Sequence, residues 1–190
     1  MIRDLIIKNR SYRRFDATVK ITFKQIEKWI ELARFSASGR NMQPIKYAVC
    51  TNEQTNEKIF PNLGWAGFLT NWEGPAENEK PVAYIAVLYD KSLADTYYCD
   101  DGIAIQSILL GAVEDGFGGC VIGSVNKGKV AKILNLPDNL EILWLIALGK
   151  PAEECVLEDI QNDNIEYCRD SNDIHHVPKR TLSEIIYKWK

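Results

Sequence analysis

Residues 101–114 carry apolar side chains around almost the whole circumference of the helix that they are predicted to form. A helix of this kind cannot face water, so it lies either at the centre of a domain or against a second subunit. For a chain of 190 residues, we favour the subunit interface. The apolar residues are Ile103, Ala104, Ile105, Ile108, Leu109, Leu110, Ala112 and Val113.

The strongest strand signal is the nearly continuous apolar run over residues 82–88, which predicts a strand buried on both faces. We also expect a central strand over residues 140–148 and shorter strands over residues 47–50 and 120–122. The glycine-rich connections follow helices rather than strands, which disfavours a doubly wound parallel sheet. The sequence therefore predicts an α+β fold in a single domain spanning residues 1–190.

Capping residues mark where several helices begin. Thr22 with Gln25, and Thr181 with Glu184, have the capping-box pattern, in which two side chains satisfy backbone N–H groups at the start of a helix. Asn52 is a further N-cap candidate. Residues 151–172 are acidic and read as an irregular arm over the surface or over a neighbour. We expect helices over residues 4–8, 22–35, 52–59, 127–135 and 181–189.

The composition argues against several classes of partner. The net charge is only −3, which disfavours nucleic acid as the main partner. No apolar run approaches the roughly 18 residues that a membrane span needs, and the N-terminal segment is too short and too charged for a signal peptide. We therefore expect a cytoplasmic protein. The five cysteines fit reduced thiols, and we predict no metal site because the only two histidines are adjacent.

Positive charge is concentrated near the two ends of the chain. Residues 9–15 contain three arginines and the hydroxyl of Ser11, and Lys179 with Arg180 forms a second cluster. These clusters are either solvated surface or two halves of one pocket for a small, multiply charged anion. A phosphate monoester on a cofactor is the leading candidate for that anion. No nucleophile and base pair stands out, so a bound cofactor should carry the chemistry if the chain is an enzyme.

A long connection over residues 64–80 carries the aromatic residues Trp65, Phe68 and Trp72. Loops of this length inside a domain are usually functional or mobile. The connection is either a lid over a binding site or an irregular packed surface. As a lid, its three aromatic side chains would form part of a substrate pocket suited to flat acceptors.

Five segments, taken in order, resemble the FMN-dependent nitroreductase family, and they cover nearly the whole chain. The resemblance implies an intertwined α+β homodimer with a central, mostly antiparallel sheet flanked by helices and with FMN at the subunit interface. It also implies that residues 151–190 form an arm that reaches the partner subunit. The segments are NRSYRRF (9–15), SASGRNMQP (36–44), the run over residues 101–123, LGKP (148–151) and HVPKR (176–180).

The activity implied by the resemblance is a two-electron transfer through flavin N5. NADH or NADPH would reduce the flavin and leave before a nitroaromatic, quinone or similar small acceptor takes its place, in a ping-pong cycle. No side chain is expected to act as a catalyst, because flavin N5 carries the chemistry. The alternatives are an ene-reductase or dehalogenase on the same fold, and a non-catalytic FMN-binding or storage protein.

The resemblance further implies which residues surround the cofactor. Arg10 would bind the phosphate together with Lys179 and Arg180, and Ser11 would form a hydrogen bond nearby. Arg13 would lie near flavin N1 and O2, where a guanidinium stabilises the reduced, anionic ring. The other expected contacts are Ser38, Gly39, Asn41 and Gln43, with the Ser38–Asn41 loop supplied by the other subunit, and the backbone N–H groups of Gly123 and Ser124 near N5.

Overall fold

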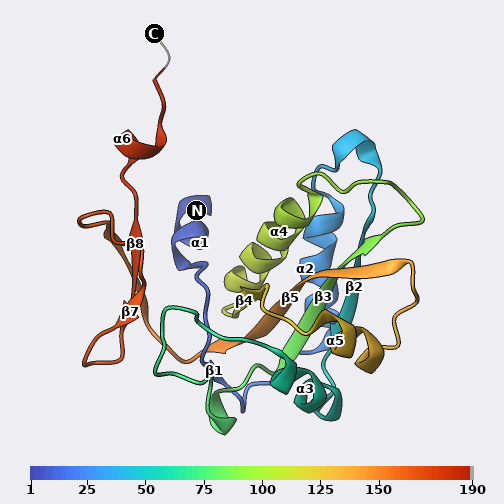
Figure 1. The fold of residues 1–190 in the computed structure, drawn as a ribbon, viewed down its shortest axis with the longest axis horizontal. Helices are drawn as coiled ribbons and strands as arrows, with labels where there is room; N and C mark the ends of the chain where they lie inside the picture. Colours follow the sequence, from blue (N-terminus) through green and yellow to red (C-terminus); the bar gives the residue numbers. More distant parts are fainter. Residues whose placement is uncertain (189–190) are drawn as a thin grey trace.

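An antiparallel sheet of five strands organises the chain, which the computed structural model describes over residues 1–188 (Figure 1). Strand β5 (Leu140–Pro151) pairs with β1 (Phe15–Asp16), β3 (Ala83–Asp90) and β4 (Gly118–Ile122), and β2 (Ile45–Cys50) pairs with β3. All of these pairings are antiparallel, which confirms the predicted α+β fold. Strand β2 begins earlier than predicted and β5 ends later, because backbone pairing continues beyond the apolar runs.

Helices cover both faces of this sheet, so successive residues of β3 enter different cores. Ile85 and Val87 belong to a buried cluster that includes residues of helices α2 and α4. Tyr84 and Leu88 belong to a second buried cluster, which includes residues of α3 and α5. Burial on both faces explains why the sequence of β3 is continuously apolar. The helices are α2 (Phe23–Arg34), α3 (Glu53–Ile59), α4 (Asp100–Glu114) and α5 (Lys127–Ile133).

Helix α4 lies along α2 and is buried over most of its apolar surface. Ile108 is fully buried, whereas Ile103 is 37% exposed. Gly111 allows the two helices to approach closely, since a Cβ at this position would lie 2.6 Å from Cδ1 of Leu32. A central position in the domain therefore accounts for most of the apolar circumference. Only the side of α4 that carries the exposed Ile103 remains available for the predicted contact with a second subunit.

The predicted helix caps form where the sequence indicated them. Thr22 accepts a hydrogen bond from the backbone N–H of Gln25, and Asn52 accepts one at the start of α3. The closing helix is shorter than predicted, since α6 covers only Leu182–Ile185. Its apolar side chains Leu182 and Ile185 are exposed, and a short helix without packed side chains is marginally stable. The predicted end of this helix, Trp189, lies outside the described residues. The remaining helices are α1 (Ile2–Lys8) and the 3-10 turns Gly39–Asn41, Phe60–Asn62 and Glu77–Glu79.

The C-terminal segment forms a small sheet of its own, so the prediction of irregular structure over residues 151–172 is wrong. Strand β8 (His175–Lys179) pairs in parallel with β6 (Cys155–Asp159) and antiparallel with β7 (Cys168–Arg169). The sequences of β6 (CVLED) and β8 (HHVPK) lack a regular apolar alternation, so they gave no strand signal. Figure 1 shows β7, β8 and α6 apart from the main sheet, on the side of the molecule that carries α1. Within residues 1–188, no helix combines the length and apolar character that crossing a bilayer requires.

Candidate anion-binding site

The two cationic clusters from opposite ends of the chain meet at one cavity of about 350 Å³. Arg10, Ser11 and Arg13 line it from the N-terminal segment, and Lys179 lines it from the end of β8. The cavity wall is completed by residues of α4, β4, β6 and β8 and by Tyr167, which directly precedes β7. The N-terminal segment is fixed to β4, since the backbone N–H of Tyr12 donates to the carbonyl of Gly119 over 3.1 Å.

The cations at this cavity differ from their neighbours because they have no carboxylate partner. Within residues 1–188, Arg10, Arg13 and Lys179 form no ion pair. By contrast, Arg14 pairs with two carboxylates, and a hydrogen bond to Glu79 raises its pKa. Nε of Arg10 is also buried without a hydrogen-bond partner. Unpaired guanidinium and ammonium groups around one cavity suit a small anion that brings several acceptor oxygens.

Arg180 takes a different position from Lys179, although the two are adjacent in sequence. Its guanidinium lies 2.9 Å from a carboxylate oxygen of Asp163 and 3.3 Å from one of Glu184. These partners raise its pKa, the hydrogen bond to Asp163 contributing most. Arg180 does not line the cavity, so the structure brings three of the four expected cations together and leaves this one outside.

A buried carboxylate that the sequence did not single out holds the N-terminal segment in place. Glu153, with a side chain only 1% exposed, accepts hydrogen bonds from the backbone N–H groups of Arg13 and Arg14. Its other oxygen accepts from Arg169 over 2.7 Å. The local sequence around Glu153 is simply acidic, so only the long-range contact shows this role.

The side chain of Arg13 is held by three neighbours. Its Nη1 donates to the carbonyl oxygen of Ser11 over 3.2 Å and lies 3.3 Å from Nε2 of His175. Its Cζ lies 4.7 Å from the centroid of the Tyr167 ring, in cation–π geometry. Tyr167 and His175 also line the cavity, and neither was singled out from the sequence.

The loop that carries Ser38, Gly39, Asn41 and Gln43 lies outside this cavity. Ser38 and Gln43 line another cavity, of about 260 Å³, beside α2 and β2. Asp100, 5% exposed at the start of α4, accepts from the Ser38 hydroxyl over 2.6 Å and from the Gly39 N–H over 2.8 Å. The same loop holds Asn41 and Gln43 in the left-handed region, at φ of 56° and 51°. A single chain therefore leaves this loop away from the cationic cavity.

Gly123 and Ser124 follow β4, whose Val121 lines the cationic cavity, but they do not line it themselves. A Cβ on Gly123 would lie 2.8 Å from the ring of Trp144, so close packing requires glycine here. The carbonyl of Ser124 accepts a hydrogen bond of 2.7 Å from Gly64. Within residues 1–188, the backbone N–H groups of Gly123 and Ser124 donate no hydrogen bond.

The aromatic residues of the 64–80 connection also lie outside the cavity. Phe68 packs edge-on against Tyr167 with ring centroids 5.0 Å apart, and the Arg169 guanidinium lies 4.5 Å above the Trp72 ring. Trp65 packs against Phe60. Phe68 therefore contacts a residue that lines the cavity, although Phe68 does not line the cavity itself.

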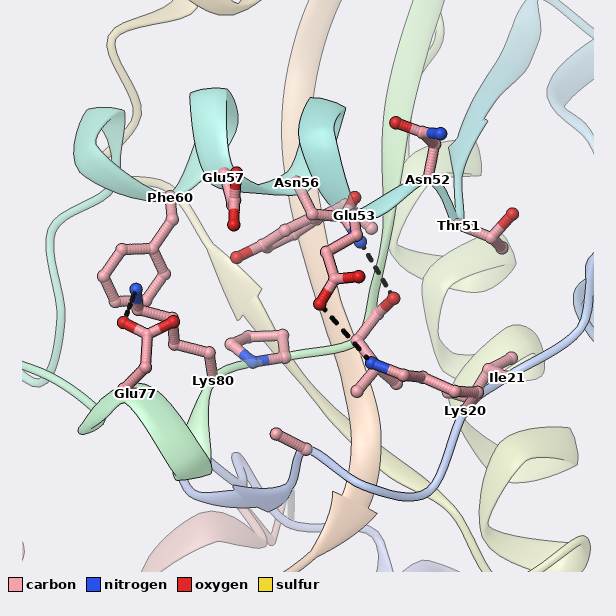
Figure 2. Close-up of a pocket in the computed structure, with 14 residues that line it drawn as sticks. Lys20, Ile21, Thr51, Asn52, Glu53, Asn56, Glu57, Phe60, Glu77 and Lys80 are labelled. Atoms are coloured by element: carbon pink, nitrogen blue, oxygen red, sulfur yellow. Dashed lines mark hydrogen bonds and ion pairs between the residues drawn. The ribbon is translucent and has the colours of Figure 1, made fainter.

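A third cavity, of about 440 Å³, differs from the cationic cavity in its charges. Figure 2 shows Lys20 and Lys80 at this cavity, each joined to a carboxylate. Lys20 lies 3.8 Å from Glu53, and Lys80 forms an ion pair with Glu77. Because both lysines have a carboxylate neighbour, the described residues that line this cavity include no cation without an ion pair. None of the residues predicted to bind the cofactor lines it.

The antiparallel sheet covered by helices on both faces places the chain among the α+β proteins, and three cations without an ion pair within residues 1–188 line one cavity beside it. A model of the nitroreductase family matches residues 6–74 and 75–150, so the chain belongs to the nitroreductase family. This match confirms the family that the sequence motifs resembled.

The chain is also similar to known proteins, in sequence to one and in fold to others. The chain is 25% identical over 186 residues to an oxygen-insensitive NADPH nitroreductase of Helicobacter pylori, covering 80% of this chain and 88% of that protein. The fold is similar to that of a nitroreductase family protein of Streptococcus pneumoniae, with a TM-score of 0.72, 18% identity and 100% of both chains covered. It is also similar to an NADPH:FMN oxidoreductase of Vibrio harveyi complexed with NAD+, with a TM-score of 0.66, 21% identity, and 96% of this chain and 80% of that chain covered.

Proposed function

We propose that this protein is an FMN-dependent oxidoreductase that takes electrons from NADH or NADPH and passes them to a nitroaromatic, a quinone or a similar small acceptor. The observation that carries the proposal is the meeting of three unpaired cations, Arg10, Arg13 and Lys179, at one cavity. Family membership supports it, as do the names of an NADPH nitroreductase and an NADPH:FMN oxidoreductase among the relatives.

The donors at the cavity fit the phosphate end of FMN. Arg10 has a buried Nε without a partner, and Ser11 and Lys179 add a hydroxyl and an ammonium group on the same cavity wall. A phosphate monoester accepts hydrogen bonds from all three kinds of donor. These three residues would therefore hold the phosphate. Arg180 is already paired with two carboxylates, so we leave it out of the phosphate site.

The ring end of the cofactor is assigned to Arg13. FMN, when bound, supplies a ring that accepts a hydride at N5 and gives up two electrons to an oxidant. A guanidinium near N1 and O2 stabilises the negative charge of the reduced ring and so raises its potential. The backbone N–H groups of Gly123 and Ser124, which donate no hydrogen bond within residues 1–188, would face N5. Release of the oxidised nicotinamide before the acceptor binds would give ping-pong kinetics.

The complete site requires a second copy of the chain. The Ser38–Gln43 loop lies outside the cationic cavity of its own chain, so this loop would reach the cofactor of the partner subunit. Exposed apolar residues at both ends of the chain support a homodimer, because they would be buried by a partner. The C-terminal arm, residues 151–190, would make part of that contact. The exposed residues are Met1, Ile2, Ile6, Ile7, Leu182, Ile185, Ile186 and Tyr187.

Anaerobic titration of the purified protein tests the proposal. We expect a yellow protein that is bleached by NADH or NADPH and is reoxidised by a quinone or nitroaromatic. A yellow protein that neither nicotinamide reduces would instead indicate an FMN-binding or storage protein. A reduced flavin that only an activated alkene or a halogenated substrate reoxidises would indicate an ene-reductase or dehalogenase. A colourless protein that takes up no FMN would refute the proposal.

A further inference from the structure

The buried histidine at the start of β8 contacts the arginine that we place at the flavin ring. His175 is only 2% exposed, and its Nε2 lies 3.3 Å from Nη1 of Arg13. The Tyr167 ring packs against both groups, with its centroid 5.2 Å from that of the His175 ring and 4.7 Å from Cζ of Arg13. The guanidinium therefore lies against an imidazole and a phenol ring that both come from the C-terminal segment.

The chemistry of this contact fixes the state of the imidazole. A guanidinium can only donate hydrogen bonds, so Nε2 of His175 must accept and Nδ1 must carry the proton. Burial is the main cause that lowers the pKa of His175, and the charges of Arg13, Arg169 and His176 lower it further, whereas Glu153 opposes them. The neutral imidazole that the hydrogen bond needs is thus the form that its surroundings favour.

The contact also leaves one edge of the guanidinium without a hydrogen-bond partner within the described residues. Nη1 is occupied by the Ser11 carbonyl and by His175. Within residues 1–188, Nε and Nη2 of Arg13 donate no hydrogen bond. These two nitrogens form the side of a guanidinium that offers two parallel N–H groups, the geometry that binds a pair of neighbouring acceptors.

We propose that His175 is a positioning residue, which holds Nη1 of Arg13 so that the Nε and Nη2 edge is presented to the paired acceptors N1 and O2 of the flavin. The proposal rests on the proposed function, because it needs Arg13 at the ring. Without this acceptor, the guanidinium of Arg13 would keep only the hydrogen bond to the Ser11 carbonyl and the contact with the Tyr167 ring, so it would be held less firmly against the flavin. The reduced flavin would then lose part of the charge that stabilises it.

The test compares the flavin midpoint potential of the FMN-loaded wild type with that of three variants, by anaerobic spectroscopic titration. His175→Leu removes the acceptor, and His175→Gln keeps an oxygen that can accept from Arg13. His176→Leu is the matched control, since that neighbouring ring instead contacts Glu158 over 3.1 Å and Asp170 over 3.4 Å. FMN retention and thermal unfolding are measured on the same samples, so that a general loss of structure is recognised.

We expect His175→Leu to shift the equilibrium between oxidised and reduced flavin at least tenfold toward the oxidised form, about 30 mV for a two-electron couple. His175→Gln should recover at least half of this shift, and His176→Leu should leave the potential unchanged even if it lowers the unfolding temperature. A potential that moves equally in His175→Leu and His176→Leu would overturn the proposal, because the effect would then follow stability.

An Arg13→Ala background separates this inference from the proposed function. If His175 acts through Arg13, His175→Leu should not shift the potential further once Arg13 is replaced. A shift in Arg13→Ala without one in His175→Leu would refute only the positioning role. If Arg13→Ala itself leaves the potential unchanged, the placement of Arg13 at the ring is wrong, and the proposed site must be redrawn.

Discussion

Replacing Asp100 with asparagine tests how the 38–43 loop is held, and the structure gives the size of the effect. The carboxylate is 5% exposed and accepts from both Ser38 and Gly39, and the Ser38 oxygen in turn accepts from the Gln43 N–H over 2.9 Å. Asparagine keeps one acceptor oxygen, so one charge-assisted hydrogen bond is lost, at about 1.5–3 kcal/mol. In a chain of this size, that loss lowers the unfolding temperature by about 3–12 °C.

The assay is thermal and urea unfolding of the FMN-free protein, followed by an FMN titration. Asp101→Asn is the matched control, because that neighbouring carboxylate accepts only one hydrogen bond, 2.7 Å from Nε1 of Trp144, at an exposed site. We expect the control to cost less than about 1 kcal/mol. If the loop also reaches the partner's cofactor, Asp100→Asn should weaken FMN binding as well. Equal unfolding temperatures for the two variants would refute the role of Asp100 as the anchor of the loop.

Three further predictions concern the cofactor, the sheet and pH. Lys179→Ala should raise the Kd for FMN about 10- to 100-fold, because a charge-assisted contact to the phosphate is lost, whereas Arg180→Ala should change the Kd little. Equal effects of the two variants in an FMN titration would contradict the placement of Lys179, and not Arg180, at the phosphate. Gly149→Ala should cost about 1–3 kcal/mol in urea unfolding. The reason is that the added Cβ would lie 2.7 Å from Phe15. An unchanged urea midpoint would show that β1 can shift to accommodate the methyl group without cost. Hydrogen bonds to Glu158 and Asp170 raise the pKa of His176, so its stabilisation is present below about pH 6.5 and is lost as pH rises through the raised value. The unfolding temperature of His176→Gln should therefore fall below that of wild type more at about pH 5.5 than at about pH 8.5, and a constant gap would argue against the ion pairs.

Sequence reasoning succeeded where a signal was local. Residues close together in the sequence form β3 and the helix caps at Thr22 and Asn52, so the local sequence was enough to predict these elements. We also predicted that Arg10 and Lys179 lie at one cavity. That prediction rested on two cationic clusters in a chain of low net charge and on the family resemblance, not on a local pattern.

The residues that were missed have roles set by distant contacts. Glu153 binds backbone groups 140 positions away in the chain, and His175 binds Arg13 across 162 positions. Neither shows a local pattern that distinguishes it from an ordinary acidic or histidine residue. The strands β6 and β8 were missed for a related reason, since their pairing leaves no regular apolar alternation in the sequence.

The many partners of β5 have a consequence for how the protein is made. This strand pairs with β1, β3 and β4, yet it is synthesised after all of them. During translation, β2 and β3 can pair before β5 is made, but β4 meets its neighbour only once residues up to Gly149 have left the ribosome. Until then the edges of these strands that β5 will cover stay unpaired, and unpaired strand edges are where partly folded chains tend to aggregate.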